Sequence, residues 1–290
     1  MQGRSIKQVA AQVAAQLDQP RLEPGQGAVA EPLVTMQPAG KQPPFFLIHP
    51  IAGTVFPYYQ LAALLGKDQP VYGLQAVEVN GQPAVSIEQM ALTYIAAIRT
   101  VQPQGPYFLG GWSFGAFVAF EMARQLDLVG ARVGLVASID QPALAADKLT
   151  KAWNGLQFLA TTGIPNLWPY AREYFQWPNL QNGAYAARKQ YHVQAVGDLL
   201  RFTGANSQAI MTYHPMPYRR RLTLFQTPEQ RQNLQGDPTW GWDKLAQGGV
   251  ECIEISGHHM NLLQEPHVYV LAERLRNVLQ QAQATASVAY

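Results

Sequence analysis

Residues 107–126 read YFLGGWSFGAFVAFEMARQL, and this stretch decides the fold. An apolar strand-like run enters Gly111-Trp-Ser-Phe-Gly115, and a helix with apolar residues at 117, 120, 123 and 126 leaves it. The pattern G-x-S-x-G alone arises by chance in about a tenth of chains this long. Its strand–turn–helix setting is far more specific, because it is typical of a nucleophile elbow. We therefore predict that Ser113 is a nucleophile, favoured by the N-terminus of the following helix.

Strand-like and helical runs alternate on both sides of this segment. The strand-like runs are 45–49, 70–75, 107–112, 133–140, 221–227 and 250–256, and the helical runs are 58–65, 86–101, 115–127 and 266–282. The middle strands are almost wholly apolar, as expected of strands buried on both faces. The alternation predicts a mostly parallel sheet with helices on both faces.

One long interval interrupts the alternation. Between Asp140 and Arg221 the sequence has helical periodicity, no convincing strand, and a cluster of aromatic residues over 153–177. An insertion of this length is usually functional. We interpret it as a helical lid over about 143–212, the alternative being a helical layer that only thickens the core.

The first 44 residues differ from the rest of the chain. Residues 5–17 have helical apolar spacing, whereas 18–44 are rich in proline and glycine and predict a linker without regular structure. The predicted organisation is a remnant helix over 1–18, a linker over 19–42, a catalytic domain over 43–283 and a tail over 284–290.

A serine nucleophile needs a base, which is normally histidine. His258 and His259 follow the last strand-like run, and spacing alone does not choose between them. The other four histidines are interpreted as structural or exposed: His49, His192, His214 and His267. An acid that orients the base has two candidates, Asp140 and Asp237, which both follow strand-like runs. Either aspartate could instead be a turn former.

An oxyanion needs two backbone donors. One candidate is the N–H of Phe114, directly after the nucleophile, and the other lies in the loop after the first strand-like run. Pro50 has no N–H to donate, so Ile51 or Ala52 must supply the second donor.

Composition excludes several classes of protein. The net charge of +2 and the lack of a basic or aromatic stripe argue against nucleic-acid binding. The single Cys252 excludes an internal disulfide framework and a cysteine-based zinc site, and its apolar run suggests a core residue. No apolar run suits a signal peptide or a membrane span, so the expected location is the cytoplasm, without a metal or a membrane partner.

Four segments together resemble a known family. They are FFLIHPIAGTVFPYYQLA (45–62), YFLGGWSFGAFVAFEMARQL (107–126), SID (138–140) and GHHMNLLQEPHVYVLAERL (257–275). They resemble the thioesterase domains that end non-ribosomal peptide synthetases and polyketide synthases, within the α/β-hydrolase superfamily. The resemblance implies the α/β-hydrolase fold, with Asp140 as the acid, His259 as the base and Ile51 with Phe114 as the oxyanion donors.

The resemblance also implies a substrate and a partner. An acyl chain, peptide or polyketide, would arrive as a thioester on the phosphopantetheine arm of an upstream carrier domain. Residues 1–18 resemble the last helix of such a carrier domain. Ser113 would take the chain as an acyl-serine, released by hydrolysis or macrocyclisation, with no cofactor bound by the chain itself. Apart from the resemblance, the aromatic cluster of 153–177 leads us to expect that Trp168, Phe175 and Trp177 of the lid bind the substrate.

Three other functions remain open at this point. A stand-alone editing thioesterase shares much of the pattern, and a carboxylesterase shares the nucleophile elbow. The non-enzyme alternative is a hydrolase-fold binding module, although such modules commonly lose a member of the triad.

Overall fold

The computed structural model describes residues 32–79, 81–84, 86–144, 195–233 and 236–288, together with Ala11. The predicted carrier remnant, apart from Ala11, and most of the predicted linker and lid lie outside these residues. So do Trp168, Phe175 and Trp177.

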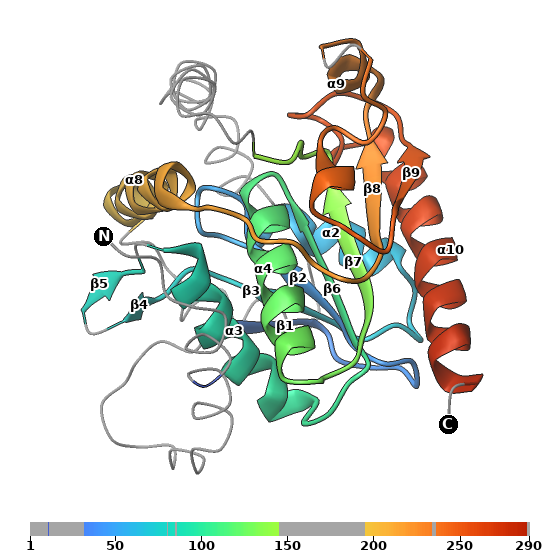
Figure 1. The fold of residues 1–290 in the computed structure, drawn as a ribbon, viewed down its shortest axis with the longest axis horizontal. Helices are drawn as coiled ribbons and strands as arrows, with labels where there is room; N and C mark the ends of the chain where they lie inside the picture. The colour runs from blue at the N-terminus through green and yellow to red at the C-terminus, as the bar shows by residue number, and fades with distance from the viewer. Residues whose placement is uncertain are drawn as a thin grey trace.

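A seven-stranded sheet forms the centre of the molecule, with strand order β1-β3-β2-β6-β7-β8-β9 (Figure 1). All neighbours run parallel except β1 and β3, which are antiparallel. The predicted mostly parallel sheet is therefore confirmed. The strands are β1 (Leu33–Gln37), β2 (Phe45–Ile48), β3 (Val71–Leu74), β6 (Tyr107–Trp112), β7 (Val133–Ile139), β8 (Leu222–Gln226) and β9 (Val250–Glu254), beside a small hairpin of β4 (Glu78–Val79) and β5 (Gln82–Pro83).

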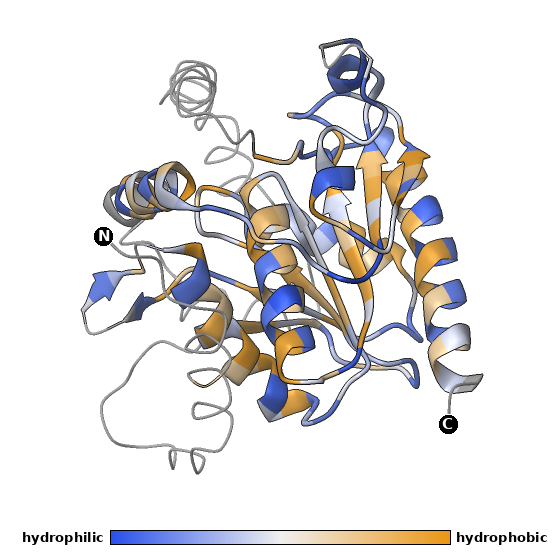
Figure 2. Cartoon of the chain, viewed as in Figure 1, coloured by the Kyte–Doolittle hydropathy of each residue, from blue (hydrophilic) through white to orange (hydrophobic). Residues whose placement is uncertain are grey.

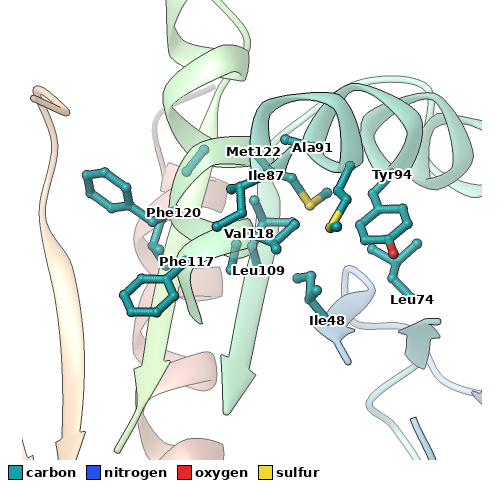
Figure 3. Close-up of a cluster of buried hydrophobic side chains, with 14 of the residues drawn as sticks. Ile48, Leu74, Ile87, Ala91, Tyr94, Leu109, Phe117, Val118, Phe120 and Met122 are labelled. Carbon is teal, nitrogen blue, oxygen red and sulfur yellow. The ribbon is translucent and has the colours of Figure 1, made fainter. Parts of the chain in front are cut away.

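Helices cover both faces of the sheet. On one face α3 (Ile87–Val101) and α4 (Phe114–Leu128) pack a buried apolar cluster against the strands (Figure 3). On the other face α2 (Tyr59–Leu64) and α10 (His267–Val288) pack a second cluster. The other helices in the described part of the chain are η1 (Phe56–Tyr58), α8 (Ala195–Thr212), α9 (Pro228–Asn233) and η2 (Trp242–Lys244).

Hydropathy explains which elements lie inside. Strands β2 and β6 are buried along their whole length, as their unbroken apolar sequences predict. Strand β8 is also buried along its whole length, although it contains Thr223 and Gln226. Helix α10 alternates between hydrophobic and hydrophilic residues, because only one side of it faces the sheet (Figure 2). Among the described helices, none combines the length and the apolar character needed to cross a bilayer.

Two sequence-based predictions need correction. Residues Leu33–Gln37 form the edge strand β1, whereas the prolines and glycines of 18–44 predict a linker without regular structure. Pro32 and Pro38 flank this strand instead of interrupting it, and a proline outside a strand removes no ladder hydrogen bond. Cys252 is exposed and not a core residue, because β9 is the opposite edge of the sheet and its side chains alternate outward.

Candidate active site

Ser113 lies on a sharp turn between β6 and α4. Its backbone has φ 57° and ψ −128°, a conformation that residues other than glycine rarely adopt. The turn is held by hydrogen bonds from the Ser113 N–H to Ile139 O (3.2 Å) and from the Ala116 N–H to Ser113 O (3.0 Å). Backbone strain of this kind concentrates at functional sites.

Close backbone contacts explain the two glycines that flank Ser113. A Cβ atom at Gly111 would lie 2.3 Å from the carbonyl carbon of Gly115. A Cβ atom at Gly115 would lie 2.2 Å from Ile48 O in β2. Both contacts are to backbone, which has little freedom to move. Glycine at these positions therefore lets the first turn of α4 approach β2 and β6 closely.

The structure brings Asp140 and His259 together. Asp140 follows β7 and is fully buried, and His259 lies in the loop after β9. His259 Nδ1 lies 2.9 Å from Asp140 Oδ2 and 3.1 Å from the backbone carbonyl oxygen of Asp140. The other carboxylate oxygen, Oδ1, accepts the Thr227 N–H at 2.8 Å. Since both groups facing Nδ1 are acceptors, Nδ1 donates, and Nε2 of a neutral ring is left to accept a proton.

The loop of His259 packs against the turn that carries Ser113. The ring of Trp112, the residue before Ser113, lies 5.3 Å from the His259 ring between centroids. The parallel strands β6 and β7 end at the same edge of the sheet, so Ser113 and Asp140 follow neighbouring strands. Three loops that are distant in sequence therefore meet beside Ser113.

The rival acid and the rival base lie in other settings. Asp237 accepts hydrogen bonds from the Thr239 hydroxyl (2.7 Å) and from the N–H groups of Thr239 (2.9 Å) and Gly241 (2.7 Å). These bonds, above all that of the Thr239 hydroxyl, lower the pKa of Asp237. His258 is exposed, and its N–H donates to Asn261 Oδ1 at 2.7 Å. Asp237 thus stabilises a local turn. His258 Nδ1 accepts the Met260 N–H at 3.3 Å, whereas the Asp140 carboxylate is bonded to His259.

The two predicted oxyanion donors follow adjacent strands. Ile51 lies after β2 and Phe114 after β6, and these strands pair with Ile48 opposite Gly111. Tyr58 holds the two strand ends in place: its hydroxyl donates to Ile48 O (2.8 Å) and accepts the Trp112 N–H (2.9 Å). Sequence reasoning missed Tyr58, because its partners are at least ten residues away and no local pattern indicates them.

No group of three or more histidine, cysteine, aspartate or glutamate side chains among the described residues is arranged to hold a metal ion.

Comparison with known families identifies the chain. Residues 43–279 match the thioesterase domain family. The chain belongs to the thioesterase domain family. Its central sheet and covering helices are those of the α/β-hydrolase fold that thioesterase domains share, so the predicted fold class is confirmed.

Similar thioesterase sequences occur within much longer proteins. The chain is 33% identical over 260 residues to malpinin synthetase of Mortierella alpina, covering 84% of this chain and 3% of that protein. It is 31% identical over 261 residues to nonribosomal peptide synthetase btyA of Aspergillus terreus, covering 82% of this chain and 28% of that protein. The chain thus spans less than a third of either relative.

A solved thioesterase domain matches nearly from end to end. The NocB thioesterase domain from the nocardicin cluster, solved as a covalent complex with a fluorophosphonate nocardicin G analog, shares 27% sequence identity with this chain. The TM-score is 0.62, and the match covers 85% of this chain and 99% of the other.

Proposed function

We propose that this chain is a serine thioesterase that releases a carrier-bound peptide or polyketide chain through an acyl-serine intermediate. The observation that carries the proposal is the buried Asp140 carboxylate, which bonds His259 Nδ1 at 2.9 Å beside the strained turn of Ser113. Membership of the thioesterase family supports hydrolase activity on a thioester. Ser113 is the proposed nucleophile, His259 the base and Asp140 the acid.

Acylation follows from the hydrogen bonds of His259. Its Nε2 accepts the proton of the Ser113 hydroxyl as the oxygen attacks the thioester carbonyl. The N–H groups of Ile51 and Phe114 stabilise the tetrahedral oxyanion. The carbon–sulfur bond then breaks, and the imidazolium returns its proton to the departing thiolate. Asp140 stabilises the imidazolium throughout, and Thr227 holds the carboxylate in place.

Release repeats these steps with a second nucleophile. Water, or a hydroxyl or amine of the acyl chain itself, gives its proton to His259 and attacks the acyl-serine. Water yields a linear acid, and an internal nucleophile yields a ring. The proposed lid, with Trp168, Phe175 and Trp177, would decide between them by holding the chain near Ser113 and limiting the access of water.

The proposed partner is an upstream carrier domain that presents the chain on a phosphopantetheine arm. One matching relative is named malpinin synthetase and another nonribosomal peptide synthetase btyA, and the chain covers only a small part of each of them. Residues 1–18 would be the last helix of that carrier.

An active-serine probe tests the proposal directly. A fluorophosphonate should label the wild type, whereas Ser113→Ala and His259→Ala should remain unlabelled because the nucleophile or its base is gone. His258→Ala is the matched control and should be labelled normally, since His258 is exposed and lies outside the Asp140 pair. An unlabelled wild type, or labelling that depends on His258 and not on His259, would refute the assignment.

A further inference from the structure

His49 is a buried histidine that the acyl-transfer steps leave unused. It directly follows β2 and precedes Pro50 and the predicted oxyanion donor Ile51. Its side chain is fully buried, and both ring nitrogens have partners. Nδ1 lies 2.7 Å from the carbonyl oxygen of Pro50, and Nε2 lies 2.7 Å from the hydroxyl of Tyr94.

The partners of the ring fix its protonation. The Pro50 carbonyl can only accept, so Nδ1 must carry a proton. Burial lowers the pKa of His49 from 6.5 to about 4, which keeps the ring neutral at physiological pH. Nε2 is therefore an acceptor. Burial raises the pKa of Tyr94, so its hydroxyl stays protonated and donates to Nε2.

The peptide bond next to this ring is the one that matters for catalysis. The Pro50 carbonyl and the Ile51 N–H belong to the same planar peptide group. Holding the carbonyl in one direction therefore aims the N–H in the opposite direction. The Gly53 N–H also donates to Pro50 O, at 2.9 Å, so two donors hold this carbonyl. A chain of hydrogen bonds thus runs from Tyr94 through His49 to the peptide that carries the predicted donor.

The same ring also touches the residue that supplies the second donor. It stacks on the side chain of Phe114, with centroids 5.6 Å apart and an angle of 20° between the planes. Tyr94 lies on α3, in the buried apolar cluster on the sheet face that α3 and α4 cover. Its ring packs there beside Leu74 and Ile48, which holds its hydroxyl in place (Figure 3). His49 therefore contacts the peptide that precedes one predicted oxyanion donor and the side chain of the residue that supplies the other.

We propose that His49, held in one tautomer by Tyr94, is the positioning residue that aims the Ile51 N–H at the oxyanion. This inference rests on the proposed function, because it assigns a role in the same reaction. His49 does not touch the substrate. It acts through the Pro50–Ile51 peptide, whose orientation determines whether the oxyanion meets a donor or a carbonyl oxygen.

The test compares two substitutions of similar size. His49→Asn keeps a nitrogen at the place of Nδ1, and so keeps a donor for Pro50 O, whereas His49→Leu has none. His49→Leu should lower kcat by about 10- to 100-fold, as a misplacement of about 1 Å does, and leave KM within about twofold. His49→Asn should recover most of this loss. Tyr94→Phe, which keeps the ring, should lower kcat in the same direction by a smaller factor.

A transition-state analogue separates positioning from general structural damage. A trifluoromethyl ketone forms an oxyanion on the serine, so its Ki should rise by the same factor by which kcat/KM falls across the variants. A merely structural role would change stability or KM without this proportionality. Wild-type kcat and Ki in folded His49→Leu or Tyr94→Phe would overturn the inference. A wild type that neither cleaves thioesters nor binds the ketone would instead overturn the proposed function, and the inference with it.

Discussion

The substitution Asp140→Asn tests the assignment of the acid more sharply than removal of the whole carboxyl group would. In the wild type one carboxylate oxygen accepts the Thr227 N–H and the other accepts Nδ1 of His259. An asparagine must keep its carbonyl oxygen toward the Thr227 N–H, because the opposite orientation would bring two donors together. Its NH₂ group then faces Nδ1, which favours the tautomer that has its proton on Nε2 and cannot accept a proton from Ser113.

The size of the effect follows from the remaining contacts. In serine proteases the same substitution lowers kcat by about 10⁴-fold through the wrong tautomer. Here the backbone carbonyl oxygen of Asp140, 3.1 Å from Nδ1, can still accept a hydrogen bond from an Nδ1–H group. We therefore expect the acylation rate to fall by about 10³- to 10⁴-fold, with the smaller figure reflecting this second acceptor.

The assay is single-turnover release of thiol from a synthetic acyl thioester. Cys252 is exposed and would react with thiol reagents, so all variants should carry Cys252→Ser. The control is Asp237→Asn, which changes an aspartate bound only to its own turn and should leave the rate nearly unchanged. A near-normal rate for folded Asp140→Asn, with a large loss for Asp237→Asn, would refute the reasoning.

Three further predictions concern stability. Gly115→Ala should destabilise the domain by about 1–3 kcal/mol in denaturant titrations, because its Cβ would meet a backbone carbonyl. Gly204→Ala, in open space on α8, should stabilise the domain by about 0.5–1 kcal/mol. Equal effects of the two substitutions would contradict the close-approach explanation. Burial lowers the pKa of His49 from 6.5 in the unfolded state to about 4 in the folded state. At about 1.36 kcal/mol per pKa unit, the neutral ring contributes about 3 kcal/mol to the free energy of unfolding. This contribution is complete above pH 6.5 and is lost as the pH falls to about 4. His49→Asn should flatten that part of the acid denaturation curve, and an unchanged curve would show that the ring is not buried neutral. Asn206, 1% exposed, donates to Ile51 O at 2.8 Å, so Asn206→Leu should cost about 1–3 kcal/mol by leaving that carbonyl unpaired, and a wild-type denaturation midpoint would contradict this.

The sheet and its helices were predictable because they depend on local patterns. Buried parallel strands need continuous apolar runs, and the elbow needs glycine at 111 and 115, so both features are visible in the sequence. The edge strands were harder to interpret. Strand β1 is short and flanked by prolines, and Cys252 in β9 belongs to a strand that is only half covered.

The site was predictable only in part. Residues alone left two acids and two bases open, since Asp237 and His258 occupy loops as suitable as those of Asp140 and His259. The resemblance to a family chose between them, and the contact between Asp140 and His259 agrees with that choice. Supporting contacts such as Tyr94 to His49 join residues far apart in the chain, and no spacing rule indicates them.

Peptide mass spectrometry of the trapped acyl-enzyme tests the central claim most directly. The chain would be mixed with a slowly released acyl thioester, quenched in acid within the burst phase and digested to locate any added mass. We predict one acyl group on the peptide that contains Ser113, retained in His258→Ala and absent from Ser113→Ala. Turnover of the thioester without an adduct on that peptide, or an acyl group that persists in Ser113→Ala, would contradict it.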